Sequence, residues 1–151
     1  MTRILGVDYG SKRVGLAISD GIGLTARPLA TVGRRELAST LRALADEFEI
    51  AEVVVGLPTS LSGNEGPSAA AARELADEIA EILGVDPSFV DEKFTTKLAE
   101  SSLLEAGMKR RDRKETVDRV AAAIILQTYL DNRRRTGNSP HDEGVEPPGN
   151  P

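Results

Sequence analysis

Apolar residues along the chain fall into two alternating patterns. Residues 4–7 and 14–18 are short apolar segments separated by a polar turn that contains Gly10, which predicts two paired strands. Segment 36–48 carries apolar residues at helical spacing. Segment 52–57 is a continuous apolar run, typical of a strand that is covered on both faces.

Turn and capping residues divide the rest of the chain in the same way. Pro67 suits the first position of an alanine-rich helix, and Gly84 suits its end. The remaining expected elements are a strand at 28–32, a loop at 58–66, a helix at 67–83, a strand at 87–92, a helix started by Thr95 or Thr96 and ended by Gly107, and a last helix at 115–132. This order predicts an α/β fold, with a mixed five-stranded sheet and helices on both of its faces.

Composition indicates the class of protein. A chain of 151 residues with 40% hydrophobic residues suits one domain with one core, which we expect at 1–132. Residues 133–151 hold four prolines and three glycines with almost no apolar residues, so they are expected to be a disordered tail. No signal peptide or bilayer-spanning apolar run is visible, which favours a soluble cytoplasmic protein. The formal net charge of -5 argues against nonspecific coating of nucleic acid.

The inventory of reactive side chains is short. The absence of cysteine excludes thiol chemistry and cysteine-ligated zinc. The single histidine, His141, lies in the proline-rich tail, which argues against a histidine general base. No glycine-rich nucleotide-binding loop of the common types is present. Any enzymatic chemistry is therefore expected to rest on carboxylates.

Four acidic residues fall where a site is expected. Asp8 ends the first strand, Asp91 and Glu92 end the last, and Asp118 begins an otherwise apolar stripe of the final helix. The carboxyl ends of parallel strands are where sites in such sheets form. Converging carboxylates need cations, and oxygen ligands select Mg²⁺ or Mn²⁺. The alternative is structural, because Asp8 could form a turn and the other acids could favour helix N-termini.

Basic residues cluster near the same elements. They are Lys12 and Arg13, Lys93 and Lys97, and the run of Lys109, Arg110, Arg111, Arg113 and Lys114. Such residues could position the phosphate backbone of a nucleic acid, and a plain solvated loop is the alternative for the last run. With three Phe and two Tyr, base stacking is not expected to dominate recognition.

Four ordered motifs resemble one family. They are residues 8–17, residues 55–58 followed by Gly63, residues 91–96 with Ala99, and residues 118–122 with Leu126 and 129–131. Together they are similar to the YqgF family, also called the RuvX-type Holliday junction resolvase family, which has an RNase H-like fold. The resemblance runs from about Arg3 to Asp131.

The resemblance implies a small nuclease, usually assigned to processing of the 5′ end of precursor 16S rRNA. It implies that Asp8, Glu92 and Asp118 hold the metal, with Asp91 in reserve. The mechanism would be two-metal hydrolysis, with two Mg²⁺ or Mn²⁺ ions roughly 3.5–4 Å apart. Where the family usually has Arg after the acidic pair, this chain has Lys93, which keeps the charge and lacks the bidentate fork.

Other functions stay open at this point. A Holliday junction resolvase is the older family assignment, and a non-catalytic RNA-binding factor for ribosome assembly is a further alternative. The glycine-flanked Asp8 turn also resembles the first phosphate-binding element of the actin and sugar-kinase superfamily, but those proteins use two such domains. Precursor rRNA, branched DNA and ribosomal particles are the expected partners, for a monomer or a homodimer.

Overall fold

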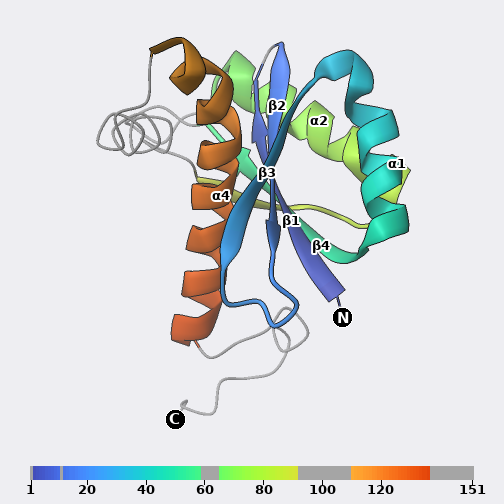
Figure 1. Cartoon of the computed structure of the whole chain (residues 1–151), viewed down its shortest axis with the longest axis vertical. Coiled ribbons are helices and arrows are strands. Elements are labelled where there is room, and N and C mark those ends of the chain that lie inside the picture. The colour runs from blue at the N-terminus through green and yellow to red at the C-terminus, as the bar shows by residue number, and fades with distance from the viewer. Residues whose placement is uncertain (1, 11, 59–64, 92–109, 137–151) are drawn as a thin grey trace.

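The computed structural model describes residues 2–10, 12–58, 65–91 and 110–136. Within this part, five strands form one sheet in the order β3-β2-β1-β4-β5 (Figure 1). The strands are β1 (Thr2–Tyr9), β2 (Arg13–Ser19), β3 (Ala26–Gly33), β4 (Glu49–Leu57) and β5 (Ser88–Asp91). The helices are a short 3₁₀ turn, η1 (Arg34–Glu36), followed by α1 (Leu37–Glu47), α2 (Pro67–Leu83) and α4 (Arg110–Thr136).

The sheet is mixed, as the sequence predicts. β1 pairs antiparallel with β2, and β2 pairs antiparallel with β3. β1 pairs parallel with β4, and β4 pairs parallel with β5. The carboxyl ends of β1, β4 and β5 therefore lie at the same end of the sheet as the start of β2 and the end of β3. This end is where the sequence places its candidate residues.

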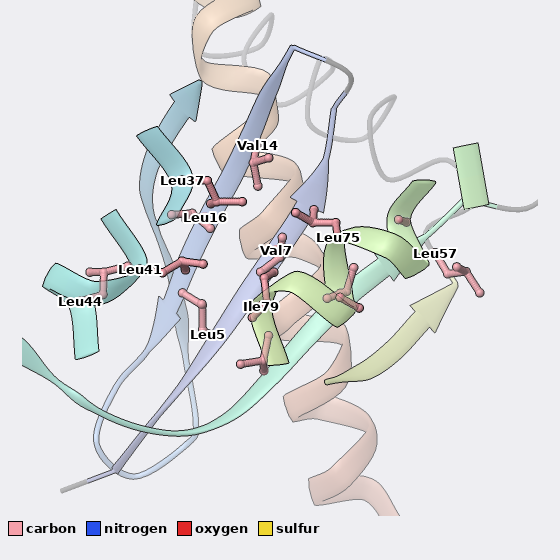
Figure 2. Close-up of a cluster of buried hydrophobic side chains, with 14 of the residues drawn as sticks. Leu5, Val7, Val14, Leu16, Leu37, Leu41, Leu44, Leu57, Leu75 and Ile79 are labelled. Atoms are coloured by element: carbon pink, nitrogen blue, oxygen red, sulfur yellow. The ribbon is translucent and has the colours of Figure 1, made fainter. Parts of the chain in front are cut away.

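Helices α1 and α2 cover one face of the sheet (Figure 1). Figure 2 shows the apolar cluster between them, in which Leu37 and Leu41 of α1 and Leu75 and Ile79 of α2 meet the sheet. The strands contribute alternate residues to this cluster: Leu5, Val7, Val14, Leu16, Val53, Val55 and Leu57. Alternation puts the intervening residues on the other face.

Helix α4 covers that second face (Figure 1). Ala122, Ile125, Leu126 and Leu130 are buried there together with sheet residues such as Val54. The predicted strand at 52–57 is thus covered on both faces, and helices on both faces of a mixed five-stranded sheet are confirmed.

Two glycines let α4 lie very close to the sheet. A Cβ atom added at Gly6 would lie 2.8 Å from the Cβ of Leu126 and 3.0 Å from the carbonyl oxygen of Ala122. A Cβ added at Gly15 would collide with the backbone carbonyl of Asp118. Real Cβ atoms do not approach their neighbours so closely. Gly15 of β2 therefore allows the backbone of α4 to lie directly against the sheet.

The helix ends follow the capping residues where these are described. Pro67 opens α2, and Gly84 ends it in the left-handed region with φ 72°. Helix α4 is longer than the predicted 115–132, because it begins at Arg110 and continues through Thr136. Arg133, past the predicted end, donates from Nη1 to both carboxylate oxygens of Glu52 at 2.9 Å.

Tyr129 completes this contact at the far end of α4. Its hydroxyl donates to Glu52 Oε1 at 2.7 Å, and Arg133 lies over its ring at 5.4 Å from the centroid. Partial burial and the hydrogen bond to Glu52 raise the pKa of the Tyr129 hydroxyl. The cluster of Glu52, Tyr129 and Arg133 fastens the last turns of α4 to β4.

Several sequence expectations lie outside the described residues. They concern most of the loop at 58–66, the helix between Thr95 or Thr96 and Gly107, and residues 137–151 of the predicted tail. Residues 133–136, which were also expected to be disordered, are instead the last residues of α4. Among the helices that are described, none has an apolar stretch that could cross a membrane.

Gly15→Ala is expected to destabilise the fold by about 2 kcal/mol or more, because the added methyl group would push α4 off the sheet. Gly66→Ala is the control, since a Cβ there meets nothing within 4 Å, and loss of a helix-start glycine should cost less than about 1 kcal/mol. Urea unfolding of both variants measures the difference. Equal stability of the two variants would show that α4 does not need the contact at Gly15.

Candidate functional site

Asp8 is a buried carboxylate near the end of β1. Its residue is 5% exposed, which is rare for an acid unless a partner or a cation meets it. Alternation along β1 puts Asp8 on the same face as Ile4 and Gly6, which both lie against α4. Its partner in the register with β2 is Gly15. Asp8 therefore faces α4 at the carboxyl end of the strand.

Asp118 of α4 lies close to this end of the sheet. Its backbone carbonyl lies against Gly15, and Gly15 is paired with Asp8. Gly15 thus places the backbone of Asp118 next to the strand position that is paired with Asp8. The Asp118 side chain is 22% exposed, so its carboxylate is open to solvent at one side. Two of the acids predicted from the sequence are brought together by this contact.

Arg13 meets Asp118 at this point. Its Nε donates to Asp118 Oδ2 at 3.3 Å, and the two side chains are 44% and 22% exposed. Arg13 stands two residues before Gly15 on β2, and hence on the α4 face. The predicted basic residue thus lies beside a predicted acidic one, where it provides positive charge at the rim of the site.

Lys12, the neighbour of Arg13, belongs to the other side of the turn. It lines a cavity of about 310 Å³ together with Gly33, Arg34, Arg35 and Glu36. The sequence reasoning did not select Arg34 and Arg35. The signal that could have found them is their position directly after β3, which antiparallel pairing returns to the start of β2.

Asp91 is separated from Asp8 by the sheet. It pairs with Leu57, which belongs to the cluster under α1 and α2. Phe89, two residues earlier, has Arg73 of α2 over its ring at 4.8 Å, while Val90 packs with the α4 cluster. Asp91 therefore lies on the α2 face of β5, and Asp8 on the α4 face.

The other predicted site residues are described in part or not at all. Glu92, Lys93 and Lys109 lie outside the described residues. The run 110–114, which we expected to form a loop, is instead the start of α4, and only its backbone is described. A helical backbone is compatible with the sequence there, since Arg and Lys are good helix formers.

The described acids fit a hard divalent cation in part. Asp8 and Asp118 carry carboxylate oxygens on two different elements, and oxygen ligands suit Mg²⁺ or Mn²⁺. No group of three or more potential metal ligands exists among the residues that the structure describes. A third protein ligand would have to come from another part of the chain or be replaced by water.

Comparison with known protein families and proteins relates the chain to one family. The model of the RuvX family, described as Holliday junction resolvase, matches residues 2–132. A relative from Myxococcus xanthus, named "Putative pre-16S rRNA nuclease", is 45% identical over 150 residues, which cover 96% of this chain and 99% of the relative. A relative of the same name from Moorella thermoacetica is 44% identical over 138 residues, covering 89% of this chain and 99% of its own.

Solved structures support the fold. Thermus thermophilus RuvC in complex with a Holliday junction substrate has a TM-score of 0.55 at 17% identity, over 89% of this chain and 96% of that chain. A further structure of T. thermophilus RuvC has a TM-score of 0.52 at 18% identity, over 90% of this chain and 97% of that chain. The expected RNase H-like fold is confirmed by this likeness.

The pair of Arg13 and Asp118 is expected to add little to stability, because both side chains are partly exposed. A double-mutant cycle with Arg13→Gln and Asp118→Asn, followed by urea unfolding, should give a coupling energy below about 1 kcal/mol that falls with added salt. A coupling several times larger that does not respond to salt would show that Asp118 is a structural acid fixed by Arg13.

Proposed function

Because the chain belongs to the RuvX family, we propose that it is a metal-dependent nuclease that hydrolyses phosphodiester bonds and processes the 5′ end of precursor 16S rRNA. The observation that carries the proposal is that the backbone of Asp118 lies against Gly15, the strand partner of the buried Asp8. A protein that only bound nucleic acid would gain nothing from two carboxylates facing phosphate. With a cation between carboxylate and phosphate, the same acids become useful.

Asp8, Asp118 and Glu92 are the residues that would hold Mg²⁺ or Mn²⁺. Bound divalent ions supply the activation of water and the stabilisation of the leaving oxygen in a two-metal hydrolysis. Asp8 is fixed by β1 and buried, which suits a central ligand. Asp118 is more exposed and already beside Arg13, which suits a ligand at the rim.

Glu92 is preferred to Asp91 as the third acid. Asp91 lies on the α2 face of β5, with the sheet between it and Asp8. A carboxylate on that face cannot share a cation with Asp8 unless the strand turns over. The sequence alone left these two acids as alternatives, and the face of Asp91 favours Glu92.

The basic residues provide contacts to the nucleic-acid backbone. Arg13 stands at the rim beside Asp118, and the guanidinium fork suits a phosphate. Lys12, Lys93 and the run of Lys109, Arg110, Arg111, Arg113 and Lys114 would add further phosphate contacts. Contacts of this kind position the strand without reading its sequence, and they weaken with added salt.

A second candidate is resolution of Holliday junctions, favoured by the description of the family model. In either case we take the catalytic unit to be the domain that the family model matches at residues 2–132, extended to the end of α4 at Thr136. The tail proper would begin after the end of α4.

We place the protein in the cytoplasm, where precursor rRNA and ribosomal particles would be its partners.

Asp8→Asn, Asp118→Asn and Glu92→Gln are each expected to lower the rate of RNA cleavage at least about a hundredfold, because each removes a ligand charge from the metal site. The assay offers a labelled RNA with the 5′ precursor segment of 16S rRNA, with Mg²⁺, Mn²⁺ or EDTA. A four-way DNA junction in parallel tests the second candidate. Cleavage should stop in EDTA.

Asp91→Asn is the matched control, since it removes one carboxylate from the opposite face of β5 and should leave the rate within about threefold. Circular dichroism confirms that all variants fold. Cleavage that persists in EDTA or in Asp8→Asn would contradict the metal-dependent nuclease. A large loss in Asp91→Asn with none in Glu92→Gln would reverse the choice between these two acids.

A further inference from the structure

The cavity beside Lys12 lies at the same end of the sheet as the acids. It is bounded by the β1–β2 turn on one side and by the end of β3 and η1 on the other, through Gly33, Arg34, Arg35 and Glu36. Figure 1 shows β3 passing into η1 and α1 at that end of the sheet. The cavity is open to solvent, and its volume of about 310 Å³ leaves room for a small anion such as a phosphate group.

The walls of the cavity are joined by the backbone. Arg13 pairs with Gly33 in the β2–β3 register, and the N–H of Arg34 donates to the carbonyl of Lys12 at 3.3 Å. Lys12 and Arg34, more than twenty positions apart in the sequence, are therefore held side by side before any ligand arrives. A preformed site loses less entropy on binding.

The lining carries an excess of positive charge. Lys12, Arg34 and Arg35 oppose the single acid Glu36. Arg34 is partly compensated, since its Nη2 lies 3.5 Å from Glu78 Oε1 on α2. Arg35 is exposed and forms no ion pair with the residues that the structure describes. A lining with this excess of positive charge favours an anion.

Arg34 retains unused hydrogen-bonding capacity next to the cavity. Its Nη1 is buried and has no hydrogen-bond partner among the described residues. Buried donors in folded proteins are nearly always paired, so an acceptor that reached Nη1 through a shift of the Arg34 side chain would satisfy this donor. The guanidinium also lies over the ring of Tyr9, at 5.8 Å from the centroid, which holds it at the cavity.

We propose that this cavity is a second phosphate-binding subsite, which holds the backbone of the nucleic acid at a phosphate other than the one that is cut. Lys12 and Arg13 are neighbours that serve opposite faces of the turn: Arg13 lies beside Asp118, and Lys12 lines the cavity. A strand that crosses the tip of the β1–β2 turn would meet positive charge on both sides. The inference rests on the nucleic-acid substrate of the proposed function.

Arg35→Gln tests the subsite, because Arg35 lines the cavity, is exposed and has no part in the acidic site. Arg42→Gln is the control, since Arg42 is an exposed arginine on α1 outside the cavity lining. Binding of a labelled single-stranded RNA oligonucleotide to the full-length protein is measured in EDTA by fluorescence anisotropy over a salt series. Arg35→Gln should weaken binding about fivefold at low salt. It should also reduce the slope of log affinity against log salt by about 0.7, whereas Arg42→Gln should change neither.

Inorganic phosphate is the second probe. In ¹⁵N-labelled protein it should shift the amide signals of Gly33, Arg34 and Arg35, and the shifts should shrink in Arg35→Gln. Equal RNA affinities and slopes for the Arg35 and Arg42 variants would overturn the subsite, even if phosphate shifts these amides, since the cavity would then take only a free anion.

The cleavage assay separates this inference from the proposed function. With an active enzyme, Arg35→Gln should raise KM about fivefold and leave kcat unchanged, because the subsite holds substrate away from the reacting phosphate. If the wild type cleaves nothing and Arg35→Gln still weakens RNA binding, the nuclease proposal fails and the subsite stands. If the wild type cleaves RNA and Arg35→Gln behaves as Arg42→Gln in every assay, the subsite fails and the nuclease proposal stands.

Discussion

The contact between Gly15 of β2 and the backbone of Asp118 in α4 is the constraint on which the candidate site depends. A side chain at position 15 would hold the helix away from the sheet, and Asp118 would move with it. Gly6 and the alanines of α4 extend the same close approach along the helix. At the other end, Glu52 holds Tyr129 and Arg133. The position of Asp118 near Asp8 is thus set by packing of α4 on the sheet from Asp118 to Arg133.

The sheet separates charge into two regions at one end of the molecule. Asp8, Asp118 and Arg13 lie on the α4 face, and Lys12, Arg34 and Arg35 lie around a cavity on the other side of the β1–β2 turn. Strand alternation puts Asp8 and Arg13 on the α4 face, whereas Lys12 precedes β2 and Arg34 and Arg35 lie in η1, which leads to α1. A chain with an overall charge of -5 can therefore still present positive charge to phosphate next to its acids.

Much of this arrangement is predictable from local patterns. The strands, the helix opened by Pro67 and closed by Gly84, and the positions of Asp8 and Asp118 at one end of the sheet all follow from periodicity and capping. What depends on tertiary contact is not predictable in this way. The ion pair of Arg13 and Asp118 joins residues 105 positions apart in the sequence. The cavity depends on the register between β2 and β3. Helix α4 extends beyond its predicted end, where Arg133 contacts Glu52. The face of Asp91 likewise depends on its pairing with Leu57.

The most direct measurement is a crystal structure of the full-length protein, determined from crystals soaked with Mn²⁺. Anomalous scattering would locate the metal. Placement of the acids by Gly15 predicts manganese bound by carboxylate oxygens of both Asp8 and Asp118, on the α4 face of the sheet. Manganese held by Asp91 on the α2 face, or no manganese within bonding distance of Asp8, would contradict the assignment of this site.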